Sequence, residues 1–297
     1  MSRKLVLGAD IGGSHITVGV IDLQTNSVLK DTKSRLELNS NGSLEEILAV
    51  WQKAIQHSCD LFGAKPTHLG ISMPGPLDYE KGISLINGQD KYDALFGLNI
   101  KELLADRMSM KVANISFVND AVAFLQGEIL GGAAMSGKNI IGLTLGTGLG
   151  SVKSLNNEEI KDADLWKMPF KDSIAEEYLS TRWFVKRYGE RTAQKVANVK
   201  ILFNLAEEGD VEAQAVFNEF GHNLGLFLQR FIAIEGQVDT VVLGGNIAKT
   251  AHLFTAEVFK VLGDDNNINI KQAILGEDAA LIGAAGIWKA ETAQHMV

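Results

Sequence analysis

The chain has little cysteine: Cys59 is the single one in 297 residues. One thiol excludes an internal disulfide, a thiolate-rich zinc site and an iron–sulfur cluster bound by this chain alone. The six histidines show no spacing typical of metal ligands. This cysteine usage favours a reducing compartment, so we expect a cytoplasmic protein.

Long hydrophobic runs are also missing, and no stretch approaches the roughly 20 apolar residues of a membrane span. The chain has 28 Lys and Arg against 36 Asp and Glu, a net charge of −8. This deficit of positive charge argues against a nucleic-acid partner, because phosphate binding needs clustered basic residues. Arg3 and Lys4 precede an apolar run, as in a signal peptide, but Asp10 interrupts that run too early. We therefore expect no membrane and no nucleic acid among the partners.

A hydrophobic content of 46% indicates a globular protein, and the chain length suits one or two domains. Apolar strand-like runs alternate with helical patterns along the chain, which predicts an α/β protein. Ser43 and Glu46 form a capping-box pattern that predicts a helix to about Phe62. Helices are also predicted for 173–188 and 279–290, and the small residues of the second would allow close packing on another helix.

Two glycine turns of similar design each follow an apolar run. They are Asp10-Ile11-Gly12-Gly13-Ser14 and Gly146-Thr147-Gly148-Leu149-Gly150. Glycines let main-chain N–H groups close on an anion, and such a backbone nest suits phosphate. The alternatives are a plain hairpin turn for the first and a kinked, bulged strand for the second. Asp10 beside an anion nest makes chemical sense if a cation such as magnesium lies between them.

Asn119 and Asp120 stand where a predicted strand gives way to a predicted helix. Both residue types are favoured helix N-caps, which is one sufficient explanation of the pair. The other is catalytic, because a carboxylate at a helix N-terminus stays ionised and can accept a proton as a general base. The Gly244-Gly245-Asn246 turn also has two interpretations. It is either a simple turn or a backbone surface that packs against a flat group such as adenine.

Two better-known phosphate motifs are absent. Residues 132–139 read G-x-x-x-x-G-K-N, but Asn139 replaces the Ser or Thr of a P-loop, and the segment follows a helix instead of a strand. Ser151 stands where the dinucleotide-binding pattern needs a third glycine.

Taken in order, these motifs resemble the ROK family of sugar kinases and repressors, within the actin-like ATPase superfamily. The resemblance covers nearly the whole chain. Its segments are Gly8–Gly19 (first phosphate motif), Ser72–Pro76 (the G-x-P-G segment), Phe117–Ala121 with Gly127-Glu128 (the N-D-A signature), Leu145–Gly150 (second phosphate motif) and Val242–Asn246 (adenosine motif). It implies an α/β, two-lobed actin-like (ribonuclease H-like) fold, with mixed sheets flanked by helices and a cleft between the lobes. The lobes are expected at 1–118 with 280–297, and at 119–279.

The resemblance implies an ATP-dependent kinase that transfers the gamma-phosphate to a hexose hydroxyl, as a glucokinase does, with Mg²⁺. Asp120 would be the base, and Asp10 would organise magnesium through water and ATP. The nucleotide would be held by Asp10, Gly12, Gly13, Ser14, Gly146, Thr147, Gly148, Gly150, Gly244 and Gly245. The sugar would be held by Ser72, Pro74, Gly75, Asn119, Asp120 and Glu176.

The chain departs from the family pattern at 162–180, where the family has an E-x-G-H segment followed by a three-cysteine zinc motif. This stretch has no Cys and no His, so no structural zinc is expected. Because the stretch should border the sugar, a kinase for N-acetylmannosamine or N-acetylglucosamine is an alternative. A non-catalytic, sugar-responsive regulator is another, although only 1–4 precede the first strand where such repressors carry a winged helix. The resemblance also favours a homodimer.

Overall fold

The computed structural model describes residues 4–156, 158–263 and 267–294. It has the mixed α/β composition predicted from the sequence. The chain forms two compact units: the first is Met1–Met135 with Leu275–Val297, and the second is Ser136–Ile274. Each unit has its own sheet and its own hydrophobic core.

The first unit is built on a six-stranded sheet in the order β3-β2-β1-β5-β8, with β4 also paired to β2. Its strands are β1 (Leu5–Ile11), β2 (His15–Asp22), β3 (Ser27–Val28), β4 (Ser34–Glu37), β5 (Leu69–Met73) and β8 (Ile115–Asn119). Strands β1, β5 and β8 run parallel, while β2 is antiparallel to β1. A small hairpin, β6 (Leu77–Asp78) with β7 (Ile83–Ser84), follows β5.

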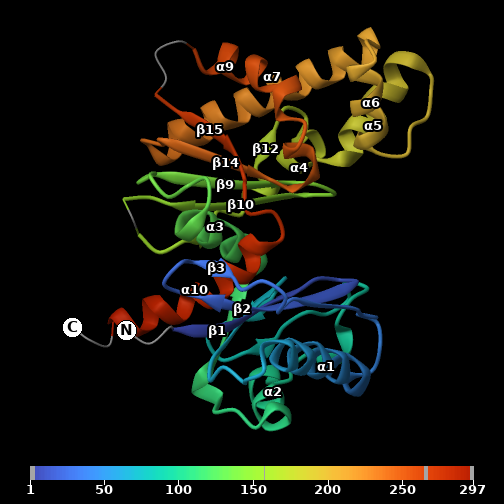
Figure 1. Cartoon of the computed structure of the whole chain (residues 1–297). Helices are drawn as coiled ribbons and strands as arrows, with labels where there is room; N and C mark the ends of the chain where they lie inside the picture. Colours follow the sequence, from blue (N-terminus) through green and yellow to red (C-terminus); the bar gives the residue numbers. More distant parts are fainter. Residues whose placement is uncertain (1–3, 157, 264–266, 295–297) are drawn as a thin grey trace. The chain divides into compact units, whose positions relative to one another are not determined.

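Helices cover both faces of this sheet. Helix α1 (Leu44–Phe62) and helix α2 (Ile100–Met108) cover one face, and α3 (Asp120–Gly131) and α10 (Asp278–Gln294) lie on the other (Figure 1). The capping box predicted for α1 is confirmed: the amide of Glu46 donates to the Ser43 side chain, and the Glu46 carboxylate accepts from the Ser43 amide. The helix ends at Gly63, whose φ of 76° suits glycine.

Helices α3 and α10 pack very closely, as expected for a small-residue C-terminal helix. A Cβ atom added at Gly283 would lie 1.8 Å from the Ala123 carbonyl oxygen, and one at Gly127 would lie 2.1 Å from that of Ala279. Helix α3 therefore belongs to the first compact unit. The units divide after Met135 and before Leu275, whereas the domain boundaries expected from the sequence follow 118 and precede 280.

Glu128 on α3 is completely buried. Its carboxylate binds both the segment just before Met135, where the first part of this unit ends, and the segment that begins at Leu275. Its Oε2 accepts the Ala133 N–H at 2.7 Å, and its Oε1 accepts the Leu275 N–H at 3.0 Å. Hydrogen bonds from two main-chain amides offset the cost of burying a carboxylate.

The second unit has a five-stranded sheet in the order β11-β10-β9-β14-β15. Its strands are β9 (Ile140–Leu145), β10 (Leu149–Ser154), β11 (Lys161–Asp162), β14 (Thr240–Gly244) and β15 (Asn269–Gln272). A separate hairpin is formed by β12 (Pro169–Phe170) and β13 (Ser173–Ile174). Its helices are α4 (Ala175–Tyr178), α5 (Thr181–Thr192), α6 (Val199–Glu207), α7 (Val211–Glu235), α8 (Gly245–Ala248) and α9 (Thr255–Leu262).

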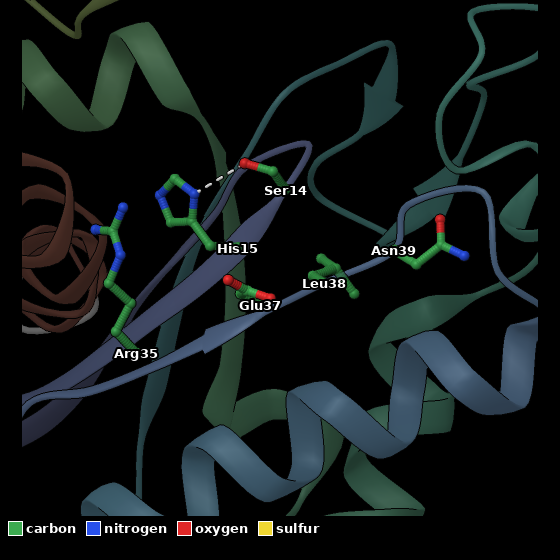
Figure 2. A pocket seen from close by; sticks show the side chains of 6 residues that line it. All are labelled: Ser14, His15, Arg35, Glu37, Leu38 and Asn39. Atoms are coloured by element: carbon green, nitrogen blue, oxygen red, sulfur yellow. Dashed lines mark hydrogen bonds between the residues drawn. The ribbon is translucent and has the colours of Figure 1, made fainter.

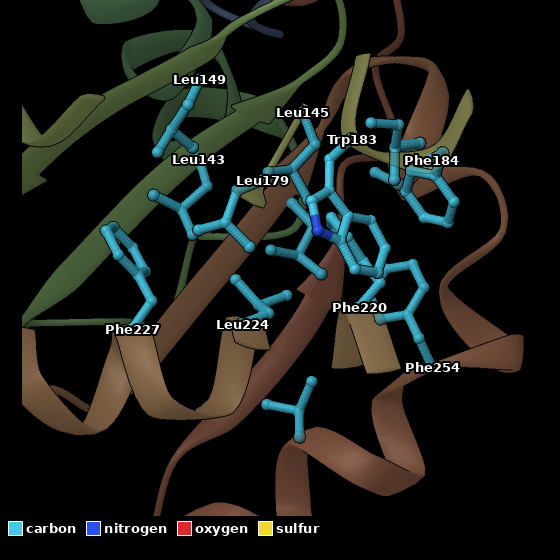
Figure 3. Packing of buried hydrophobic residues seen from close by; sticks show 14 of the residues in the cluster. Leu143, Leu145, Leu149, Leu179, Trp183, Phe184, Phe220, Leu224, Phe227 and Phe254 are labelled. Carbon is cyan, nitrogen blue, oxygen red and sulfur yellow. The ribbon is translucent and has the colours of Figure 1, made fainter. Parts of the chain in front are cut away.

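An aromatic cluster holds the helices of the second unit to its sheet. Figure 3 shows Leu143 and Leu149 of the sheet beside Leu224 and Phe227 of α7, all of them buried.

The prediction of one helix over 173–188 is wrong, because the helical structure is interrupted at Leu179–Ser180 and the chain forms α4 and α5 instead. Within the described residues, no helix is long and apolar enough to cross a membrane.

Candidate active site

Parallel pairing of β1, β5 and β8 brings three predicted site residues to one edge of the first unit's sheet. Asp10 is in register with Ser72, and Met73 is in register with Asn119. The Ser72 hydroxyl donates to Asp10 Oδ1 at 2.8 Å. These residues come from segments far apart in the sequence, and strand pairing places the side chains of Asp10 and Ser72 as neighbours.

Asn119 and Asp120 stand at the start of α3, on the same sheet edge. Asn119 Oδ1 accepts from the amides of Ala121 and Val122. Asn119 therefore caps the helix, which is one of the two roles that the sequence predicts for this pair. Its Nδ2 donates to the Tyr79 hydroxyl at 3.2 Å. Asp120 is exposed, and its Oδ1 accepts the Ala121 N–H at 2.9 Å. The exposed Asp120 is therefore the first residue of α3, at the N-terminus of the helix.

The two aspartates have different surroundings. Burial raises the pKa of the Asp10 carboxyl, the Ser72 hydrogen bond lowers it, and the charge of Asp120 raises it again. The net result is a pKa above the ordinary value. An aspartate whose pKa is raised in the folded state costs stability when ionised, so the folded protein is less stable above that pKa.

We therefore expect Asp10→Asn to raise the thermal midpoint at pH 7 by up to a few degrees. The advantage should shrink as the pH falls through the raised pKa of Asp10, because wild-type Asp10 then becomes neutral too. Thermal unfolding of both proteins across pH 4–8 measures this. Glu37→Gln, which changes an exposed acid on β4, serves as a control and should show no such trend. A lower midpoint for Asp10→Asn at pH 7 would contradict the assignment.

The remaining predicted sugar residues of the first unit follow β5. Pro74 and Gly75 lead into the segment that carries Tyr79, whose hydroxyl donates to the Met73 carbonyl at 3.1 Å. A Cβ at Gly75 would lie 2.9 Å from the Tyr79 hydroxyl oxygen, so glycine allows this approach. Sequence reasoning missed Tyr79, although it follows the Pro-Gly-Pro turn closely.

The first glycine turn is supported by a second tyrosine that the sequence did not reveal. The Tyr92 hydroxyl donates to the Gly12 carbonyl, and burial raises the pKa of this phenol, which keeps it protonated as a donor. No local pattern marks Tyr92, because its backbone lies in a left-handed conformation (φ 59°) within an irregular segment.

A pocket of about 600 Å³ lies beside this turn. It is lined by Ser14, His15, Arg35, Glu37, Leu38 and Asn39 (Figure 2). The Arg35 guanidinium donates to Glu277 Oε2 at 2.8 Å, and Ser14 Oγ lies 3.2 Å from His15 Nδ1. Of the six, only Ser14 is a predicted site residue. Arg35 adds a cation next to the turn, which sequence reasoning missed because β4 joins β2 only through long-range pairing.

The second glycine turn joins the antiparallel strands β9 and β10. The Gly146 amide donates to the Gly148 carbonyl at 3.1 Å, and the Thr181 amide and hydroxyl both donate to the Gly146 carbonyl. Glu176 Oε2 accepts the Leu149 N–H at 3.0 Å, and Arg182 pairs with the same carboxylate. The structure thus places Glu176 against the predicted phosphate turn, with Arg182 offsetting its charge.

The third glycine motif follows β14, which runs parallel to β9 with Gly244 in register with Thr144. Gly245 has φ of 85°, and a Cβ there would lie 2.3 Å from the Leu145 carbonyl oxygen. Gly245 therefore meets both needs that only glycine satisfies: a left-handed backbone and close approach to another strand.

Both phosphate turns have backbone donors to offer. Across the parts of the chain that the structure describes, the amides of Gly13, Ser14, Thr147 and Gly148 donate to no protein acceptor. A Cβ at Gly13 or Gly146 would meet nothing within 4 Å, so both turns are open to a ligand. These features fit phosphate groups. Among the described residues, no group of three or more His, Cys, Asp or Glu side chains could hold a metal ion.

The ROK family model matches residues 6–161 and 171–291, and the unmatched 162–170 lie within the stretch that departs from the family pattern. A glucokinase from Thermotoga maritima is 24% identical, with 97% of this chain and 98% of the relative covered. A xylose repressor from Bacillus subtilis is also 24% identical, with 95% of this chain and 76% of the repressor covered.

The crystal structure of a ROK family glucokinase from Streptomyces griseus, in complex with glucose and AMPPNP, has a TM-score of 0.73. It is 21% identical, with 95% of this chain and 98% of that chain covered. This similarity confirms the predicted actin-like ATPase fold. Because the ROK family model matches most of its residues, the chain belongs to the ROK family.

Proposed function

We propose that this protein is an ATP-dependent sugar kinase that transfers the gamma-phosphate of ATP to a hexose hydroxyl. The observation that carries the proposal is the exposed Asp120 carboxylate at the N-terminus of α3, on the same sheet edge as Asp10 and Asn119. An ionised carboxylate that is open to solvent can accept a proton from an alcohol.

On the acceptor side, Asp120 takes the proton of the attacking hydroxyl. The Asn119 amide and the Tyr79 hydroxyl, which are hydrogen-bonded to each other, bind neighbouring sugar hydroxyls. Ser72, Pro74, Gly75 and Glu176 complete the residues that we assign to the sugar. Ser72 acts partly through Asp10, because its hydroxyl is already donated to that carboxylate.

On the donor side, the free amides of the two glycine turns bind phosphate oxygens, and Gly244 and Gly245 lie against the nucleoside. Magnesium, when bound, neutralises charge on the transferred phosphate. Asp10 orients its water shell, and the raised pKa of Asp10 means that this role requires a pH above that value. Arg35 supplies a positive charge beside the first turn.

Two observations favour alternative functions. The stretch at 162–180, part of which the family model leaves unmatched, should border the sugar, and the chain is also similar to an N-acetyl-D-glucosamine kinase, so an N-acetylhexosamine is an alternative acceptor. The similarity to a xylose repressor supports a sugar-responsive regulator as the other alternative. In a regulator the same sugar-binding residues would act without phosphoryl transfer.

A coupled ADP-release screen of hexoses and N-acetylhexosamines, with ATP and magnesium, tests the proposal. We expect turnover of about 1–10³ s⁻¹ with at least one hexose, the range of ordinary enzymes. Turnover with N-acetylhexosamines alone would select the amino-sugar alternative. Sugar binding by calorimetry without any ADP release would overturn the kinase and favour the regulator.

A further inference from the structure

The hairpin β12–β13 carries a lysine where backbone preference does not favour one. Lys171 and Asp172 form its two-residue turn, and Lys171 has φ of 53°. Glycine and asparagine adopt this left-handed conformation at lower cost than lysine. A reason for lysine at this position must therefore come from its side chain.

The Lys171 ammonium is held from two directions. Its Nζ donates to Asn223 Oδ1 at 2.6 Å, and it lies 5.0 Å from the centre of the Tyr178 ring. Asn223 is completely buried on α7, and within the described residues its Nδ2 has no hydrogen-bond partner. Lys171 therefore satisfies a buried amide that would otherwise lack a partner, and a cation above an aromatic ring adds a further attraction.

The same turn is tied to helix α4. The Tyr178 hydroxyl donates to the Asp172 carboxylate, and the Ala175 amide donates to the Met168 carbonyl at 2.9 Å. Helix α4 is a single turn of four residues, too short to be stable without such contacts. It also carries Glu176, which accepts the Leu149 N–H of the second glycine turn.

We propose that Lys171 is a positioning residue for the second phosphate turn. Its ammonium fixes the hairpin to Asn223 of α7 and to Tyr178 of α4, and α4 in turn holds Glu176 against Leu149. Lys171 lies within 162–180, the stretch that lacks the family's zinc motif. Its side-chain ammonium ties the hairpin to α7. This inference rests on the proposed function only for its kinetic consequence.

The test uses the full chain with Lys171→Asn and Lys171→Arg. Asparagine adopts the left-handed turn more readily than lysine, so Lys171→Asn should keep the hairpin. Its short, neutral side chain removes the ammonium from Asn223 and Tyr178. We expect the KM for ATP to rise roughly two- to thirtyfold, the usual effect of substituting a residue that influences a binding site only through its neighbours. The KM for the sugar should rise less than the KM for ATP, because Ser72, Asn119 and Tyr79 of the first unit stay in place. Lys171→Arg should restore most of the ATP affinity.

Amide hydrogen exchange gives a readout that does not depend on activity. The peptide containing Leu149 should exchange faster in Lys171→Asn than in wild type, because Glu176 no longer holds that amide firmly. Lys167→Met is the matched control: it removes a lysine charge from the same stretch, where Lys167 pairs with Asp164 and is exposed.

The outcomes separate this inference from the proposed function. Unchanged exchange at Leu149 in Lys171→Asn overturns the positioning role, and so does an equal effect of Lys167→Met. If wild type releases no ADP with any sugar, the kinase proposal fails, while faster exchange at Leu149 would still support the role of Lys171.

Discussion

Asp120→Asn should lower kcat for phosphoryl transfer about 10²–10⁴-fold, the usual contribution of a general base. Asparagine keeps the shape and the hydrogen-bonding oxygen of the side chain, but it cannot accept the proton of the attacking hydroxyl. Sugar affinity should be almost unchanged, because Asn119 and Tyr79 remain in place. Steady-state kinetics and sugar titration by calorimetry measure the two effects separately.

Glu102→Gln is a suitable control for this experiment. Glu102 is also an exposed acid in the first turn of a helix of the first unit, but it has no assigned role. Both substitutions remove the modest stabilisation of an acid near a helix N-terminus, about 0.3–1 kcal/mol. Only Asp120→Asn should affect turnover. Full turnover in Asp120→Asn would leave Asp120 with the helix N-terminal role alone.

Gly283→Ala should lower the free energy of unfolding by about 3 kcal/mol, the upper end of the usual cost of overpacking. The added methyl would lie 1.8 Å from the Ala123 carbonyl oxygen, which belongs to the backbone of α3 and cannot rotate away. The two helices must therefore move apart. Since Asp120 is the first residue of α3, we also expect a loss of activity. Urea unfolding and turnover measurements test both effects.

Gly286→Ala is the matched control in the same helix. Its added methyl would meet Leu130 Cδ1 at 2.3 Å, the end of a flexible side chain that can adopt another rotamer. Replacing glycine by alanine in a helix gains about 1 kcal/mol, so this variant should be nearly neutral or slightly stabilising. Equal destabilisation by the two substitutions would show that close backbone contact at Gly283 is not the cause.

Several features could be predicted because their causes are local. The capping box of Ser43 and Glu46 lies within one helical turn, and the glycine turns are bounded by apolar runs on the same stretch of chain. The Asn119-Asp120 junction combines a strand end with a favoured N-cap. Neighbouring residues alone decide such features, so a single sequence is enough to identify them.

The rest required residues that are distant in the chain. The pairing of β1, β5 and β8 brings Ser72 to Asp10, and the fold places Tyr92 under the first turn. Glu176 was expected at the sugar by resemblance, and its hydrogen bond to the second turn depends on how α4 packs. The single helix expected over 173–188 is interrupted at Leu179–Ser180, and the next residue, Thr181, bonds to the distant Gly146.

The sequence by itself determined the class of fold, the positions of the glycine turns and the acid that we assign as the base. These depend on periodicity, backbone freedom and caps, which act over a few residues. The tertiary structure decided which side chains support those turns: Tyr92 contacts the first turn and Glu176 contacts the second. Their roles arise from strand register and helix packing, because contacts between distant segments exist only after the chain has folded.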